Sequence, residues 1–180
     1  REDIYLMLAY SHYGLSEYLI AGYHFRNFAS TYPISTKKEE ALYMTAICEY
    51  HKSLDDELDQ TFTRSAINSL QSFINKYPNS DYVEDCNGRI DELRKRLLLK
   101  AYNGAKLYYQ LGQYKAAMVA CTNALEDFPD MINRDELHYL VADAAFIYAD
   151  NSIQKLKEER FETALTAVNE YLKAFDSSSA

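Results

Sequence analysis

Three short segments of the sequence end in the same way, with an aromatic residue directly before a proline. They are FASTYP at residues 28–33, FINKYP at 73–78 and LEDFP at 125–129. Proline lacks a backbone N–H and forces the preceding residue out of helical geometry, so helices tend to end just ahead of it. All three prolines of the chain are used in this way, which predicts one helical unit used repeatedly.

A small residue lies at a fixed distance before each of these stops. Ala21, Ala66 and Ala117 each lie twelve residues before a proline, and Ala164 lies twelve residues before Asp176 in a fourth segment. Further alanines lie upstream of these four, at Ala9, Ala46, Ala105 and Ala144. Where two antiparallel helices cross closely, a side chain larger than methyl would hold the backbones apart. The paired alanines therefore predict four helix pairs, which bury their apolar stripes by stacking.

The best-preserved copy is AYNGAKLYYQLGQYKAAMVACTNALEDFP, residues 101–129. Its alanines, its glycine at Gly112 and its proline resemble the tetratricopeptide repeat, a helix–turn–helix unit of about 34 residues. We therefore expect an all-α tetratricopeptide-repeat solenoid of about four helix pairs.

Two features depart from a regular repeat. The second and fourth copies carry polar insertions, and the acidic residues of the first insertion are Asp55, Asp56, Glu57 and Asp59. They lack the glycine and the terminal glutamate of a calcium-binding loop, so we expect a solvated insertion. Helical periodicity also continues from the second proline to the third copy, which predicts one long helix over residues 81–110. This helix would join the expected domains, an N-terminal half at 1–80 and a C-terminal half at 81–180.

Composition and charge narrow the range of functions. The net charge of −8 argues against nucleic-acid binding, which needs a basic face. No catalytic constellation, glycine-rich phosphate loop or metal-ligand spacing stands out, so we expect no enzyme, no cofactor and no metal site. Cys48, Cys86 and Cys121 lie far apart and form no CxxC pair, which predicts buried free thiols. No apolar run is long enough to span a membrane.

A tyrosine follows each upstream alanine by one helical turn, and these are Tyr13, Tyr50, Tyr109 and Tyr148. In a helical solenoid the concave side offers an extended binding surface. An aromatic groove for extended peptides would there be lined by Tyr10, Tyr13, Tyr43, Ile47, Tyr50, Tyr102 and Tyr109. The substrate contacts in this hypothesis are Tyr10, Tyr13, Tyr43 and Tyr50. The alternative is that the tyrosines seal the joints between adjacent repeats.

Five cations lie close together on the predicted long helix of an otherwise acidic chain: Arg89, Arg94, Lys95, Arg96 and Lys100. One interpretation is a surface that docks an acidic partner. The other is a solvated helix face on which the cations pair with Glu84, Asp91 and Glu92, since residues three or four apart are neighbours on a helix.

The spacing of the insertions and of the long helix resembles a known family. Segments 27–50, 66–97, 105–129 and 151–175, with the stops YPIS and YPNS, together resemble the BamD family of outer-membrane assembly lipoproteins in its Bacteroidetes-type form. The resemblance implies a subunit of the machinery that folds β-barrels into the outer membrane, located on the periplasmic face of that membrane. Its only membrane contact would be a lipid anchor on a cysteine before residue 1.

The resemblance also implies two kinds of partner. The N-terminal repeats would bind unfolded outer-membrane protein peptides, and the C-terminal repeats would dock the periplasmic domains of the barrel-forming subunit. The protein would act by binding alone. Two other classes stay open: a periplasmic tetratricopeptide-repeat factor that coordinates the cell envelope, and a generic protein-binding adaptor domain.

Overall fold

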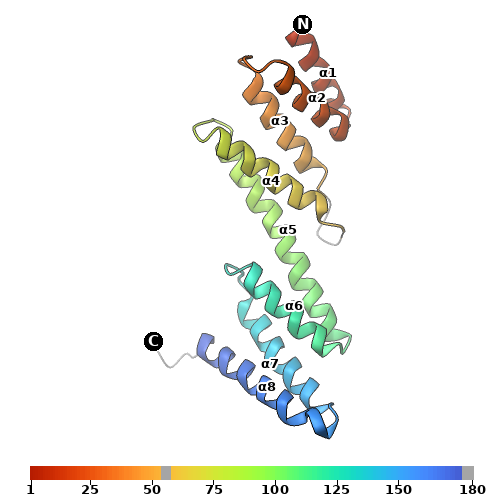
Figure 1. The fold of residues 1–180 in the computed structure, drawn as a ribbon, viewed down its shortest axis with the longest axis vertical. Coiled ribbons are helices and arrows are strands. Elements are labelled where there is room, and N and C mark those ends of the chain that lie inside the picture. Colours follow the sequence, from red (N-terminus) through yellow and green to blue (C-terminus); the bar gives the residue numbers. More distant parts are fainter. Residues whose placement is uncertain (54–57, 176–180) are drawn as a thin grey trace. The chain divides into compact units, whose positions relative to one another are not determined.

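A computed structural model describes residues 1–53 and 58–175, and all regular secondary structure in these residues is helical. The first compact unit, Arg1–Leu97, holds α1 (Glu2–Gly14), α2 (Tyr18–Thr31), α3 (Lys38–His51), α4 (Thr61–Lys76) and the beginning of α5 (Val83–Gln110). The second unit, Leu98–Ala180, holds the rest of α5 with α6 (Tyr114–Asp127), α7 (Arg134–Asp150) and α8 (Gln154–Phe175). Figure 1 shows consecutive helices running back and forth within each unit.

This arrangement confirms the predicted tetratricopeptide-type fold of four helix pairs, α1–α2, α3–α4, α5–α6 and α7–α8. The long helix predicted over 81–110 is α5, which begins at Val83 and ends at Gln110. The boundary between the compact units falls inside this helix, between Leu97 and Leu98, whereas the expected domains divide just before it. Of the acidic insertion, residues 55–57 lie outside the described part of the chain.

The eight alanines of the repeat pattern are all buried, and none is more than 3% exposed. Ala9 and Ala21 belong to one core cluster, and Ala46 and Ala66 belong to the next. The contact is closest at Gly22, where an added Cβ would lie only 3.1 Å from the Cβ of Cys48 on α3. Small side chains therefore do allow neighbouring helices to approach closely, as the spacing predicted.

The aromatic–proline stops end their helices in the expected way. Tyr32 and Tyr77 leave helical geometry with φ of −120° and −130°. Each still donates its backbone N–H to the carbonyl four residues earlier, Phe28 and Phe73 respectively, at 2.9 Å. Phe128 does the same at the end of α6. The residue before proline is thus the last to complete a helical hydrogen bond.

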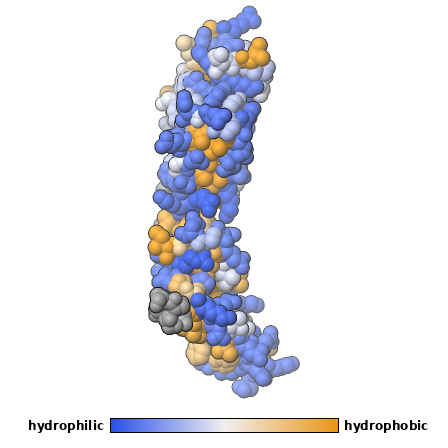
Figure 2. All heavy atoms as spheres, turned by 90° about the vertical axis from the view of Figure 1, so that its left-hand side faces the viewer, coloured by the Kyte–Doolittle hydropathy of each residue, from blue (hydrophilic) through white to orange (hydrophobic). Residues whose placement is uncertain are grey.

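The surface is mostly polar with separate apolar patches. Figure 2 shows one face, on which hydrophilic residues dominate and hydrophobic residues gather at several places. In the described part of the chain, no helix combines the length and the apolar character needed to cross a membrane.

Candidate binding surfaces

Tyrosine hydroxyls connect the first helices of successive pairs in the first unit. Each hydroxyl donates a hydrogen bond to a carboxylate on the next first helix. The bonds are Tyr10–Glu40 between α1 and α3, and Tyr43–Asp85 at 2.8 Å and Tyr50–Glu92 at 2.6 Å between α3 and α5. The two donors on α3 are seven residues apart, and so are their acceptors, so the bonds lie two helical turns apart along one joint.

The second unit repeats this arrangement between α5 and α7. Tyr102 donates to Glu136 and Tyr109 donates to Asp143, again with donors and acceptors seven residues apart. Lys106 adds an ion pair, with its Nζ 2.7 Å from Glu136. We call these five contacts the tyrosine–carboxylate pairs, and they join every first helix to the next within each unit.

In the two pairs between α3 and α5, the hydrogen bonds shift the pKa values of both partners. Burial and the bond to Asp85 raise the pKa of Tyr43, and the bond to Asp143 raises the pKa of Tyr109 to about 12. The bond from Tyr50 lowers the pKa of Glu92, and Arg96 lowers it further. Burial alone would raise the pKa of Asp85, but bonds from Arg89 and Tyr43 lower it overall. At neutral pH Asp85 and Glu92 are therefore ionised acceptors of the neutral hydroxyls of Tyr43 and Tyr50.

The remaining members of the tyrosine series and of the predicted groove have their own packing partners. Tyr13 bonds through its hydroxyl to Nε2 of His51 at 3.0 Å, and the guanidinium of Arg160 lies 4.2 Å from the ring centre of Tyr148. Ile47 is only 3% exposed, because it packs in the core of the first unit. Its inclusion among accessible groove residues was therefore wrong. The six predicted groove tyrosines are half-buried, so part of each ring stays accessible.

The predicted basic series divides into two groups on α5. Arg89 pairs with Asp85 at 2.7 Å and lies over the ring of Tyr50, and Arg96 pairs with Glu92 at 2.9 Å. The side chains of Arg94, Lys95 and Lys100 are exposed. Arg94 and Lys95 form no ion pair with any residue that the structure describes. Of the predicted pairings, that with Glu92 is present through Arg96, whereas Glu84 and Asp91 form no ion pair with any residue in the described part of the chain.

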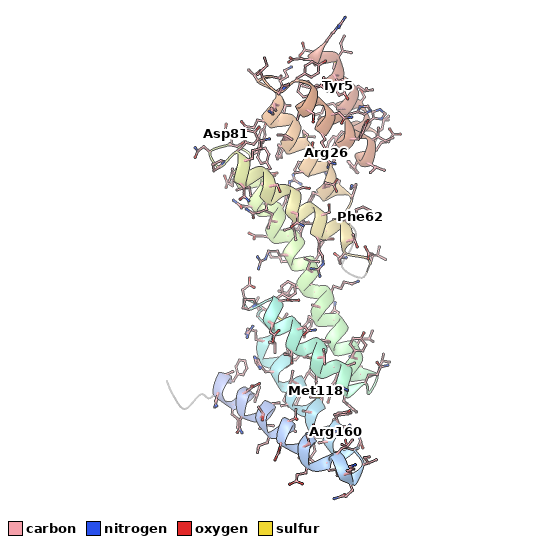
Figure 3. All side chains as sticks on the ribbon, in the orientation of Figure 1. Tyr5, Arg26, Phe62, Asp81, Met118 and Arg160 are labelled. Carbon is pink, nitrogen blue, oxygen red and sulfur yellow. The ribbon has the colours of Figure 1, made fainter. Side chains whose placement is uncertain are left out.

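A feature that the sequence did not reveal is an apolar cavity of about 840 Å³ in the second unit. It lies between the end of α5, the first turns of α6 and the end of α7. Tyr108, Tyr114, Val119 and Tyr148 supply its apolar lining, and Lys115 is its charged residue. A smaller cavity of about 320 Å³ adjoins it between α6 and α8, lined in part by Met118 and Arg160 (Figure 3). Such concave apolar surfaces are typical of binding sites.

Histidines and cysteines were also candidates for chemistry. The rings of His12 and His24, on α1 and α2, stack with centres 5.3 Å apart. Among the described residues, however, no three His, Cys, Asp or Glu side chains gather as metal ligands. The cysteines are buried free thiols, as predicted. Burial raises the pKa of Cys48 to about 12 and that of Cys86 and Cys121 to about 11, so they are protonated and unreactive at neutral pH.

The stacked helix pairs, the buried alanines at their joints and the cavities between helices define a tetratricopeptide-type repeat protein. The comparisons with known proteins narrow this class. Residues 1–158 match the family model YfiO, described as an outer membrane lipoprotein. The chain belongs to this family, which is the BamD type of outer-membrane assembly lipoprotein.

A curated relative supports the assignment. The chain is 32% identical over 113 residues to the outer membrane protein assembly factor BamD of Caulobacter vibrioides (strain ATCC 19089 / CIP 103742 / CB 15). The alignment covers 63% of this chain and 37% of that protein. The chain thus spans little more than a third of the length of the curated relative it matches.

Proposed function

We propose that this protein is a non-enzymatic scaffold in the assembly of outer-membrane β-barrel proteins. It binds segments of unfolded outer-membrane proteins and the periplasmic domains of the barrel-forming subunit. The observation that carries the proposal is the family match across residues 1–158, together with a relative that is itself named as an outer membrane protein assembly factor. The protein acts on the periplasmic face of the outer membrane, held there by a lipid anchor.

The two compact units support a division of labour. We assign substrate binding to the first unit, in which half-buried tyrosines lie along the joints between α1, α3 and α5. We assign partner docking to the second unit, with its cavity of about 840 Å³, and to the exposed cations of α5. Aromatic rings with one solvent-exposed edge suit extended peptides, and an accessible apolar surface suits a protein partner.

Recovery of the complex from native membranes tests the main proposal. The full-length lipoprotein, purified under mild conditions from its own outer membrane, is expected to bring the barrel-forming subunit with it. A double charge reversal, Arg94→Glu with Lys95→Glu, should lower that recovery if these cations dock an acidic surface. The control is Arg64→Glu, an exposed cation on α4 that forms no ion pair with any described residue. Failure of the unaltered protein to recover the barrel subunit would contradict the proposed function.

The substrate surface needs a test that separates binding from packing. Tyr10, Tyr43 and Tyr50 each donate a hydrogen bond to a carboxylate, so replacing any of these tyrosines also affects stability. A Tyr→Phe change removes the hydroxyl and keeps the ring, whereas Tyr→Ala removes both. With a synthetic extended peptide that ends in an aromatic residue, we expect the Phe variants to bind like the unaltered protein and the Ala variants to bind more weakly. If peptide affinity falls in proportion to the melting temperature in both the Phe and the Ala variants, the tyrosines only pack between helices and do not contact the peptide.

A further inference from the structure

The helix pair α5–α6 repeats the pair α1–α2 without an insertion or a gap. The crossing alanines are twelve positions apart in both pairs, so each residue of the first pair matches the one 96 positions later: Ala9 matches Ala105, and Ala21 matches Ala117. The turns match as well, because Ser16 and Gly112 both have a positive φ, of 60° and 71°. Edge-on ring pairs occupy matched positions with centres 5.5 and 5.7 Å apart: Tyr13–Tyr18 and Tyr109–Tyr114. The two pairs can therefore be compared residue by residue.

Three rings pack together beside this turn in the first pair. His12 on α1 and His24 on α2 stack with their centres 5.3 Å apart and their planes 12° apart. Tyr23 meets His24 edge-on at 5.5 Å. In the pair α5–α6 the residues matched to His12, His24 and Tyr23 are Tyr108, Ala120 and Val119. The ring on the first helix is thus kept, whereas the ring that stacks on it is replaced by a methyl group.

The cavity of about 840 Å³ lies where these rings are missing. Tyr108, Val119 and Ala120 all line it. Tyr108 is 43% exposed, and its ring meets no other aromatic ring in the part of the chain that the structure describes. Aromatic rings stack with their centres about 4.5–7 Å apart. The cavity therefore offers one ring face with the space for a second ring beside it.

The charge around the cavity favours an acidic group next to that second ring. Lys115 is the one charged side chain among the described residues that line the cavity. It is exposed and forms no ion pair with any described residue. Glu159 of α8 lines the adjoining smaller cavity together with Lys115, but the two are not paired. The ammonium group of Lys115 is thus available to a carboxylate that enters with a ligand.

We propose that this cavity docks an aromatic side chain of a partner protein, with an acidic residue next to that side chain. The ring stacks on Tyr108 as His24 stacks on His12, and the carboxylate pairs with Lys115. Aromatic side chains seated in pockets supply much of the affinity of protein interfaces. The inference deepens the partner-docking role proposed for the second unit and rests on that role for the source of the ring.

A small probe tests the site without a partner. The probe is N-acetyl-phenylalanine, which carries a phenyl ring and a carboxylate. Alanine methyl NMR signals of the full-length protein report its binding, because Ala116 and Ala120 line the cavity. We expect both signals to shift, and the uncharged amide of the probe to bind roughly fivefold more weakly, since one exposed ion pair is lost. N-acetyl-aspartate, which has no ring, should shift neither signal. No shift with the probe, equal shifts with N-acetyl-aspartate, or equal affinity of the acid and the amide would overturn the inference.

Variants show whether the probe occupies the cavity. Ala120→His introduces the ring that the first pair has at this place, so it should weaken probe binding at least about tenfold without lowering the melting temperature. Lys115→Glu leaves the apolar lining intact and should also weaken binding, because it replaces attraction by repulsion. The control is Lys155→Glu, an exposed cation on α8 that pairs with no described residue, and it should bind the probe normally. If Ala120→His and Lys115→Glu both bind the probe like the control, the inference is wrong.

Photo-crosslinking in native membranes identifies the source of the ring. A photoreactive phenylalanine replaces Gln113, an exposed residue that lines the cavity, and the crosslinked peptide is sequenced. We expect a peptide from another protein, with a Phe, Tyr or Trp beside an Asp or Glu. The same label at Ile132, which is exposed in a loop of the second unit, should capture no such peptide. A crosslink only to a second copy, only to this chain itself, or to nothing would overturn the inference.

Recovery of the complex separates this inference from the proposed function. We expect the unaltered protein to recover the barrel-forming subunit and Ala120→His to recover less of it. If both recover it equally, the inference fails while the proposed function stands. If the unaltered protein recovers no barrel-forming subunit, the proposed function fails, and the probe and the crosslinked peptide decide the inference by themselves.

Discussion

The hydroxyl of Tyr43 on α3 donates a hydrogen bond to Asp85 on α5 over 2.8 Å, although the two residues lie 42 positions apart in the sequence. Arg89 approaches the same carboxylate at 2.7 Å, and the ring of Tyr43 stacks on Tyr82 at 4.1 Å between centres. A single tyrosine thus joins two successive repeats by packing and by a polar bond. A tyrosine–carboxylate hydrogen bond between successive first helices recurs at four other places in the two units.

Replacing Tyr43 by Phe should lower the free energy of unfolding by about 1 kcal/mol. The ring stays in place, and Arg89 still satisfies Asp85, so the cost is that of one hydrogen bond to a charged group at a partly exposed site. Urea unfolding followed by circular dichroism measures the change. Tyr23→Phe, at an exposed tyrosine of α2, is the control and should change stability by less than about 0.5 kcal/mol. Equal effects of the two substitutions would contradict a stabilising role for the bond.

Stability should fall in acid because of these pairs. The pKa values of Asp85 and Glu92 lie below their ordinary values of 3.8 and 4.5 in the folded protein. As the pH drops, the unfolded chain takes up protons first, so the free energy of unfolding falls below about pH 5 and is flat above it with respect to these groups.

Unfolding midpoints measured between pH 7 and pH 3 test this dependence. The double variant Asp85→Asn with Glu92→Gln should be less stable at pH 7 and should lose less stability on acidification. If the unfolding midpoint of the double variant falls with decreasing pH as steeply as that of the unaltered protein, other carboxyls cause the loss of stability in acid.

The turn between α5 and α6 should require glycine. Gly112 has a φ of +71°, a left-handed conformation that costs other residues about 1 kcal/mol or more. Gly112→Ala should therefore destabilise the protein by about 1 kcal/mol. Ser16 holds the equivalent place after α1 with a φ of 60°, so Ser16→Gly should be neutral or stabilising. A destabilising Ser16→Gly would show that the hydroxyl matters more than the backbone strain.

Two glycines inside helices should respond in opposite ways to alanine. Gly88 on α5 has open space around it, so Gly88→Ala should stabilise the protein by about 1 kcal/mol through helix propensity. At Gly22 the new methyl would meet the buried Cβ of Cys48 at 3.1 Å. The clash should cancel the gain and destabilise the protein. Thermal unfolding compares the two variants, and similar gains in both would mean that the joint between α2 and α3 is looser than described.

The three cysteine thiols should react slowly with thiol reagents in the folded protein. Cys48, Cys86 and Cys121 are buried, and burial keeps their pKa values at about 11 to 12. An aromatic disulfide reagent at pH 8 should label none of them quickly in the native state and all three in urea. Rapid native labelling of any one thiol would reveal local opening around it.

The helix pairs could be predicted from the sequence because their signals are local. A proline acts on the residue before it, and an alanine spaced at whole helical turns marks one face of one helix. The stops at Tyr32 and Tyr77, the eight buried alanines and the extent of α5 all depend on residues close in the chain. The partners of the tyrosines do not, since each carboxylate lies 30 to 42 positions away.

Accessibility was decided by tertiary structure alone. Ile47 shares a helix with Tyr43 and Tyr50 but faces the core, and Arg89 is used in a structural pair while Arg94 on the same helix is exposed. The sequence determined which residues lie on one side of each helix. Only the packing of neighbouring helices decided how each helix is rotated, and that rotation sets which side chains are buried, which are paired and which remain free to bind.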